Sequence, residues 1–170
     1  RGNDPLQGYQ NCLQLMNEVL AGWTGEALLL IENQAGEGSP MGIALEELVQ
    51  IRNLADWPER IGFCLDTCHA FASGLWNGRN WRELETRGEA LGYFAHLKAI
   101  HLNDSAYGCG SRKDRHANIG RGMIGEQAMR ELLQSPLLSA VPFFLETPQS
   151  AAYSHRDEIR YVRQLAGEKS

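Results

Sequence analysis

Four short apolar segments of this chain each lead directly into a residue that can bind a metal ion. The segments span residues 27–31, 61–65, 97–100 and 141–145, and the residues that follow them are Glu32, Asp66, His101 and Glu146. Largely continuous apolarity of this length is typical of strands that are covered on both faces, as in a parallel sheet. The four residues are separated by 34, 35 and 45 positions, close to the length of one strand-and-helix repeat. We therefore predict an α/β domain built from successive βα units.

Helix-period patterns fill the stretches around these strands. Apolar residues recur at helical spacing in residues 6–20, 43–54, 81–94, 124–134 and 157–165. The first helix precedes the first strand, so the chain consists of one helix followed by four βα units. No linker, low-complexity tract or block of like charge divides the 170 residues, and we treat residues 1–170 as one domain.

The strand-end residues are expected to meet in space. In a parallel sheet or barrel the carboxyl ends of the strands share one face, so Glu32, Asp66, His101 and Glu146 would converge there. Three carboxylates at one place repel each other strongly unless a cation neutralises them. One or more bound divalent metal ions are the simplest way to achieve this.

Two loops add further residues of the metal-ligand type. Asp66 and His69 are three positions apart, so one turn can present both to adjacent metal ions. Asp114 and His116 flank Arg115, and in an extended loop their side chains point the same way. The second loop follows the strand that ends at His101, and we therefore expect it on the face that carries the carboxylates.

The loop of residues 110–122 is basic in an otherwise acidic chain. It contains Arg112, Lys113, Arg115 and Arg121, whereas the whole chain has 16 basic and 21 acidic residues and a formal charge of −5. This charge excludes a surface that attracts nucleic acid everywhere. A local surplus of positive charge beside predicted metal ligands suits a phosphate-bearing polyanion.

The composition also bears on the cellular compartment. No apolar run reaches the roughly 18 residues of a membrane-spanning helix, so we expect no membrane partner. The four cysteines, Cys12, Cys64, Cys68 and Cys109, form no CxxC pair. A chain of this length can build a core without cross-links, so the spacing indicates free thiols in a reducing compartment, and we expect a cytoplasmic protein.

Five strings in this sequence resemble, in order, the motifs of bacterial endonuclease IV. The strings are IENQAGEGSPMG (31–42), LDTCHAFASG (65–74), HLND (101–104), GSRKDRHANIGRGMIG (110–125) and FLETP (144–148). That family comprises zinc-dependent apurinic/apyrimidinic endonucleases of DNA repair, built on a TIM (β/α)8 barrel. The resemblance therefore implies this fold, a double-stranded DNA substrate with abasic sites, and zinc as the cofactor.

The resemblance also implies roles for individual residues in a centre of three zinc ions. Glu32 would bridge two of the ions, and Asp66, His101 and Glu146 would complete the second. The third ion would be held by His69, Asp114 and His116. Glu32 and Glu146 would be catalytic residues that hold the nucleophile, and the DNA phosphates would contact Arg112, Lys113, Arg115 and Arg121. The implied reaction is hydrolysis of the phosphodiester 5′ to an abasic site, which leaves a 3′-hydroxyl and a 5′-deoxyribose phosphate.

This sequence departs from the family pattern before Glu32. There the family supplies two further histidines to the first zinc, and this chain has no histidine before His69. A complete barrel needs about 250 residues, so we expect this chain to supply its carboxyl-terminal half, with a cut at Arg1. The two boundary strands would then have unpaired edges. We expect the isolated chain to be catalytically impaired, and the complete enzyme to be a monomer.

Two alternative functions stay open at this point. Sugar isomerases and epimerases of the xylose-isomerase-like superfamily have a similar Glu, Asp, His and Glu arrangement at strand ends, where a divalent cation assists proton or hydride transfer. They have no evident use for His69, Asp114 and His116 beside a basic loop, which favours the nuclease. A half barrel could also be a folded but inactive DNA-binding or structural fragment.

Overall fold

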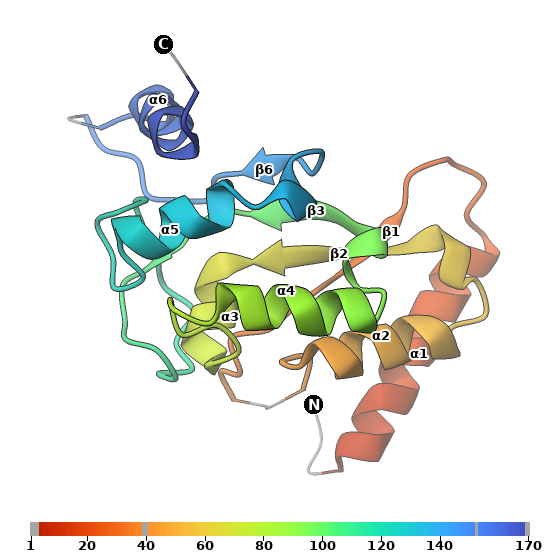
Figure 1. Cartoon of the computed structure of the whole chain (residues 1–170). Coiled ribbons are helices and arrows are strands. Elements are labelled where there is room, and N and C mark those ends of the chain that lie inside the picture. The colour runs from red at the N-terminus through yellow and green to blue at the C-terminus, as the bar shows by residue number, and fades with distance from the viewer. Residues whose placement is uncertain (1–3, 39–40, 152, 169–170) are drawn as a thin grey trace.

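Four parallel strands form the central sheet of the computed structural model, which describes residues 4–38, 41–151 and 153–168 (Figure 1). The strands, in spatial order, are β1 (Leu29–Glu32), β2 (Ile61–Asp66), β3 (Leu97–His101) and β6 (Phe143–Phe144). Because each neighbouring pair is parallel, all four carboxyl ends lie at one edge of the sheet. The register pairs Asp66 with His101 and Glu32 with Cys64, so the strand-end residues are nearly level with each other. The predicted parallel α/β architecture is confirmed.

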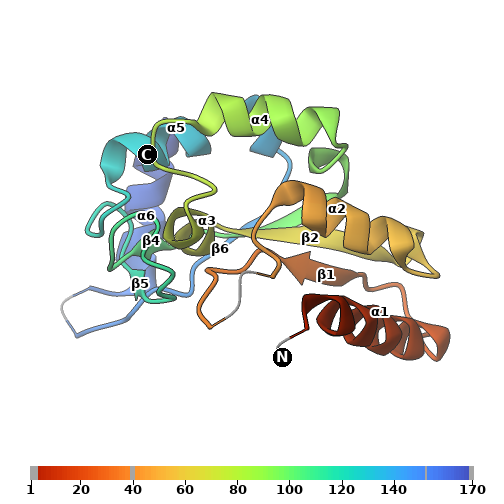
Figure 2. The ribbon, with the colours of Figure 1, turned by 90° about the horizontal axis from the view of Figure 1, so that it is seen from below.

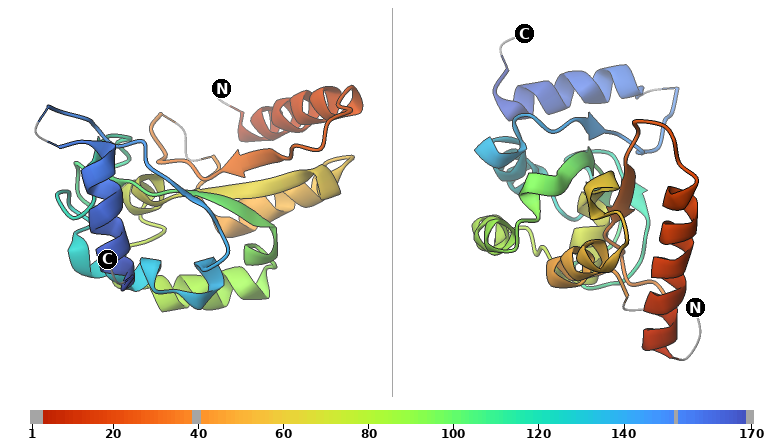
Figure 3. Two further views of the ribbon diagram at one scale, coloured as in Figure 1. Left: turned by 90° about the horizontal axis from the view of Figure 1, so that it is seen from above. Right: turned by 90° about the vertical axis from the view of Figure 1, so that its right-hand side faces the viewer.

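Helices cover one side of this sheet and both of its ends. Those that match the predicted amphipathic segments are α1 (Pro5–Ala21), α2 (Leu45–Leu54), α4 (Trp81–Ala90), α5 (Glu126–Leu133) and α6 (His155–Ala166). The helices α2, α4 and α5 lie on one side of the sheet (Figure 2). In contrast, α1 and α6 lie at its opposite ends, near β1 and β6 respectively (Figures 1 and 3). None of the helices in the described ranges is both long and apolar enough to cross a membrane.

Several predicted elements turn out shorter, and two of them have clear local reasons. The helix predicted over residues 81–94 ends at Ala90, because Gly92 takes a positive φ of 72°, and a 3-10 turn, η2 (Phe94–His96), follows it. The strand β6 has two residues instead of the five predicted. Pro142 precedes it and has no N–H for the ladder. Beyond it, the N–H of Glu146 bonds to the side chain of Asn103 and not to a strand.

One short helix and two short strands near the site have no strong sequence signal and were not predicted. The helix α3 (Thr67–Ser73) begins directly after β2, where the Asp66 carboxylate accepts the N–H of His69 as its N-cap. The strands β4 (Asp104–Ser105) and β5 (His116–Ala117) pair with each other in an antiparallel ladder. This ladder fixes the basic loop against the rest of the domain.

The core explains why Asp66, the last residue of β2, points away from α2, α4 and α5. Phe63 and Leu65 of β2 are fully buried, and the ring of Tyr93 stacks on Phe63 with centroids 4.5 Å apart. Trp81 of α4 belongs to the same apolar cluster. Because successive side chains of a strand alternate between its faces, Asp66 lies on the face opposite to Phe63 and Leu65. Packing of the apolar face therefore orients the ligand-type side chain.

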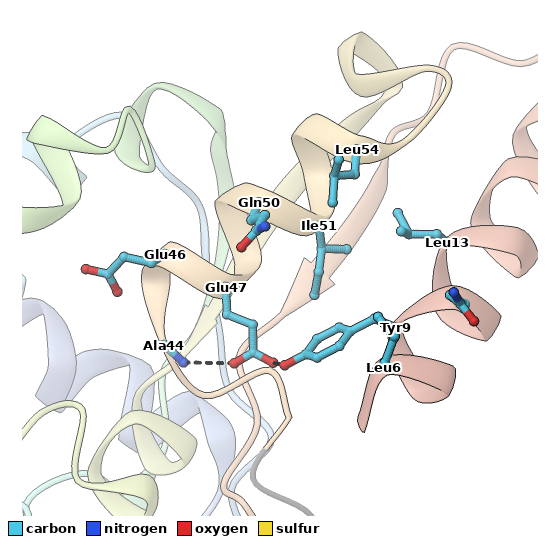
Figure 4. Close-up of a pocket in the computed structure, with 10 residues that line it drawn as sticks. Leu6, Tyr9, Leu13, Ala44, Glu46, Glu47, Gln50, Ile51 and Leu54 are labelled. Carbon is cyan, nitrogen blue, oxygen red and sulfur yellow. Dashed lines mark hydrogen bonds between the residues drawn. The ribbon is translucent and has the colours of Figure 1, made fainter. Parts of the chain in front are cut away.

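A groove of about 490 Å³ separates α1 from α2 at the β1 end of the sheet (Figure 4). Its apolar walls include Leu13 and Ile51, and the hydroxyl of Tyr9 donates to the carboxylate of Glu47 between them. Burial and the neighbouring Glu47 raise the pKa of Tyr9 to about 12. The Glu47 carboxylate also accepts N–H groups that precede α2, among them that of Ile43 at 3.1 Å. The hydrogen bond between Tyr9 and Glu47 therefore joins α1 to the first turn of α2.

Candidate metal centre

The four strand-end residues converge on one point. The Nδ1 atom of His101 lies 2.8 Å from Oε1 of Glu32 and 3.3 Å from Oε2 of Glu146. One ligand atom from each of Glu32, Asp66, His101 and Glu146 can be chosen so that all four lie within 4.8 Å of one another. Three carboxylates and an imidazole at this separation form a group that can hold a divalent cation.

A second group of three ligand-type residues lies beside the first. His69 comes from α3 and His116 from β5, and the Asp114 carboxylate lies between their rings. Its oxygens are each 3.2 Å from an imidazole nitrogen, Oδ2 from His69 Nε2 and Oδ1 from His116 Nε2. The two groups touch, because Nε2 of His116 is 3.7 Å from Oδ2 of Asp66. All seven residues singled out in the sequence as metal ligands are therefore brought together at one face.

Both histidines of the second group are oriented by backbone carbonyls. Nδ1 of His69 is 2.8 Å from the carbonyl oxygen of Asn33, and Nδ1 of His116 is 3.2 Å from that of Glu146. A carbonyl oxygen only accepts, so each Nδ1 carries a proton, and in the neutral imidazole each Nε2 is then the atom with the lone pair. Within the described residues, both Nε2 atoms are buried and have no hydrogen-bond partner. A buried imidazole nitrogen with a free lone pair beside a carboxylate is suited to bind a metal ion.

Burial sets the charge states of the metal-free site. The pKa of the fully buried Asp66 is raised because its carboxylate loses solvation, and burial likewise raises the pKa of Glu32. For His69, burial is the largest single influence and lowers the pKa. The nearby Asp66 carboxylate and other neighbours together outweigh it, so the pKa of His69 is raised. A bound cation would remove this cost of holding negative charge in a buried place.

Two cysteines border the centre but are poor candidates for its ligands. All four cysteines are free, as expected. Sulfur atoms of Cys64 and Cys68 come within 4.8 Å of ligand atoms of the site. Burial raises the pKa of Cys64 to about 12 and that of Cys68 to about 11, so both remain neutral thiols near pH 7. Metal ions bind the thiolate, and the oxygen and nitrogen donors are the better set here.

Two buried asparagines that were not predicted from the sequence support the ligands. The Asn33 side chain bridges β1 and β2, since it donates to the carbonyl of Asp66 at 3.0 Å and accepts its N–H at 2.7 Å. Asn103 donates to Oδ2 of Asp66 at 2.7 Å and accepts the N–H of Glu146 at 3.0 Å. Asn33 comes directly after the strand-end residue Glu32, and Asn103 comes two positions after His101, in the strings IENQ and HLND. Their position beside the strand ends was the sequence signal that could have identified them.

The basic loop lies beside the second group of ligands, and its cations are exposed. Lys113 lies over the ring of Tyr107, and Arg121 lies over that of Tyr153, at 4.2 and 3.8 Å from the centroids. Arg115 forms an ion pair with Glu37 at 3.4 Å. Arg112 has a positive φ of 56°, an uncommon conformation outside glycine. These residues are thus placed at the surface next to the centre.

Comparison with known proteins agrees with this geometry. The model of the xylose isomerase-like TIM barrel family matches residues 1–165. The chain belongs to this family. Its four parallel strands and their helices accordingly represent part of an α/β barrel, which confirms the predicted fold class.

Individual relatives point to one branch of the family. The chain is 43% identical over 164 residues to "Probable endonuclease 4" of Symbiobacterium thermophilum, covering 96% of this chain and 59% of that protein. It is 44% identical over 147 residues to "Probable endonuclease 4" of Methanosphaerula palustris, with coverages of 84% and 51%. The crystal structure of endonuclease IV from Thermus thermophilus superposes with a TM-score of 0.79 at 33% identity, covering 98% of this chain and 59% of that one.

These matches confirm the resemblance to endonuclease IV that the five strings indicated. The chain spans between half and three fifths of the length of these relatives.

Proposed function

We propose that this chain carries most of the zinc centre of an endonuclease IV-type enzyme, which hydrolyses DNA 5′ to abasic sites. The observation that carries the proposal is the pair of buried Nε2 atoms of His69 and His116, which make no hydrogen bond and lie on either side of the Asp114 carboxylate. Imidazole and carboxylate donors suit zinc, and seven donors exceed the needs of a single ion. We infer three zinc ions in the complete enzyme and fewer in this chain, which has no histidine before His69.

The proposed ligand sets follow the two groups. Glu32, Asp66, His101 and Glu146 would hold one ion, Glu32 would also reach the ion that lacks its two histidines here, and His69, Asp114 and His116 would hold the third. Bound zinc lowers the pKa of water to about 7 and stabilises the oxygens of an in-line phosphodiester displacement.

The chain's own residues would bind and orient the substrate. Oε2 of Glu146 is fixed by Asn103 at 3.3 Å, yet its side chain is 45% exposed, so it can hold the attacking water and accept its proton. Glu32 would assist from β1. The guanidinium groups of Arg112, Arg115 and Arg121 and the Lys113 ammonium would contact phosphates of double-stranded DNA in the cytoplasm.

Incision of a duplex with one tetrahydrofuran abasic analogue tests this function. With the full-length protein, we expect strand cleavage 5′ to the analogue, and we expect Glu146→Gln to lower kcat about 100-fold by removing the proton acceptor. Glu89→Gln, an exposed change on α4, serves as the matched control. We expect the 170 residues alone to cleave more slowly than the full-length protein. Equal rates for Glu146→Gln and the unchanged protein would contradict the role of Glu146.

The salt dependence of DNA binding tests the basic loop. Each phosphate contact that is lost should reduce the slope of log K against log salt by about 0.9. We expect Arg115→Gln and Arg121→Gln each to lower the slope by that amount, measured by fluorescence anisotropy with labelled duplex. Arg163→Gln, in the last turn of α6, should leave the slope unchanged. An unchanged slope in both loop variants would remove these residues from the DNA interface.

The matching family is named after xylose isomerase, so a sugar isomerase is the alternative function to test. The first ligand group alone would serve such an enzyme, but the second group and the basic loop have no role there. Metal analysis of the full-length protein separates the two. Three zinc ions per chain support the nuclease, and one exchangeable cation supports the isomerase.

A further inference from the structure

Glu158 is a buried carboxylate that neither ligand group uses. It lies in the first turn of α6 and has no solvent exposure. Within the described residues it forms no ion pair with a lysine or arginine side chain. A buried carboxylate is costly unless hydrogen bonds replace its hydration, so its partners indicate why it is there.

The partners of Glu158 belong to two separate segments of the metal centre. Oε1 accepts the N–H of Ile119 at 2.7 Å, and Oε2 accepts the Nδ2–H of Asn118 at 3.0 Å. Both residues lie just beyond β5, which carries His116. Oε2 also accepts the hydroxyl of Thr147, the residue directly after Glu146. One carboxylate therefore joins the segment that follows His116 to the segment that contains Glu146.

This junction bears on the orientation of one imidazole. The proton on Nδ1 of His116 points at the carbonyl oxygen of Glu146, 3.2 Å away. In the neutral imidazole that hydrogen bond leaves the lone pair on Nε2, which lies 3.2 Å from Oδ1 of Asp114. It depends on the distance between two segments that are 30 residues apart in sequence and meet at Glu158. Asn118 strengthens the junction, since its side chain also donates to the carbonyl of Pro148 at 2.9 Å.

We propose that Glu158 is a positioning residue, which holds the His116 and Glu146 segments together and thereby fixes the tautomer and aim of His116. The inference rests on the proposed function in one respect, that His116 serves as a metal ligand. Partners that orient a metal-binding histidine typically contribute about 10- to 100-fold to metal affinity.

The test uses Glu158→Gln and Thr147→Val in the full chain, with Glu89→Gln as control. Long-range ¹H–¹⁵N correlation spectra at about pH 7.5 report the tautomer of each of the five histidines. We expect His116 to be protonated at Nδ1 in the unchanged chain and to become a mixture of tautomers in both variants. Binding of Co²⁺, followed by its visible absorption, should weaken about 10-fold or more in Glu158→Gln.

The outcomes separate this inference from the proposed function. If the unchanged chain binds no Co²⁺, the proposed metal centre fails, and the His116 spectra still decide the role of Glu158. If Glu158→Gln does not fold, Thr147→Val serves in its place, because it removes one donor from the same junction with little change in volume. The His116 tautomer in that variant then tests the positioning role of Glu158. A folded variant whose His116 spectrum and Co²⁺ affinity match those of the unchanged chain would overturn the proposal.

Discussion

Removal of divalent metal is expected to lower the melting temperature of this chain by about 10 °C at pH 8, and by much less at pH 5. Ligand present at about 1,000 times its Kd stabilises the native state by about 4 kcal/mol. In a domain of this size, each kcal/mol shifts the melting temperature by about 2–4 °C. Zinc therefore has a large effect on stability if the seven ligands act as we propose.

The direction of the pH dependence follows from the pKa shifts of the metal-free site. Burial raises the pKa of Glu32 and Asp66 in the folded state, so the metal-free fold loses stability as these carboxylates ionise with rising pH. The pKa of His69 is also raised, so its contribution is complete below its unfolded value of 6.5 and is lost as pH rises through the folded value. Zinc binds the deprotonated ligands, and its affinity rises over the same range. This rise in affinity widens the difference between the metal-free and zinc-loaded chain at high pH.

Differential scanning calorimetry with excess EDTA or with excess zinc measures this difference at the two pH values. His116→Asn removes one ligand and should reduce the gain from zinc. His96→Asn, in η2 and outside the centre, should not. Identical melting temperatures with EDTA and zinc at pH 8 would show that the chain does not bind zinc in its folded state.

The convergence of the ligands was predictable because it follows from repetition. Four apolar strands at similar spacing indicate a parallel sheet, and in a parallel sheet the carboxyl ends of all strands lie on one side. Glu32, Asp66 and His101 each come at such an end, so their proximity could be predicted before any contact was known. The alternation in an extended segment likewise placed Asp114 and His116 on one side. These predictions needed only local periodicity and a rule of topology.

The supporting hydrogen bonds were not predictable in the same way. Asn33, Asn103 and Glu158 each form hydrogen bonds to segments more than 10 residues away. The local sequence around each of them resembles that of any polar loop or helix start. The length of β6 was mispredicted for the same reason. The N–H of Glu146 donates to the side chain of Asn103, a contact that the local sequence does not indicate. A long-range polar contact leaves no periodic trace in the sequence.

The largest effect on folding is expected from Asp104→Ala, which should prevent the chain from folding stably. Asp104 is fully buried, and its carboxylate accepts five backbone N–H groups. The donors are those of Ser105, Gly120, Gly122, Ile124 and Gly125. Two of these hydrogen bonds are buried and three are partly buried, and each buried donor left without an acceptor costs about 1–3 kcal/mol. The loss of all five hydrogen bonds at once therefore approaches the roughly 5–15 kcal/mol that stabilises a whole domain.

Glycine substitutions test the same loop without removing the carboxylate. A Cβ atom on Gly122 would collide with Oδ1 of Asp104 and lie 2.5 Å from the carbonyl oxygen of Ser105, and the backbone oxygen cannot move aside. We expect Gly122→Ala to destabilise the fold by about 3 kcal/mol, as overpacking of a tight core does. Gly108→Ala is the matched control, because nothing lies within 4 Å of the added atom. Urea unfolding followed by circular dichroism should show a large loss for Gly122→Ala and almost none for Gly108→Ala. Equal midpoints would mean that the loop around Asp104 is not held as tightly as these contacts require.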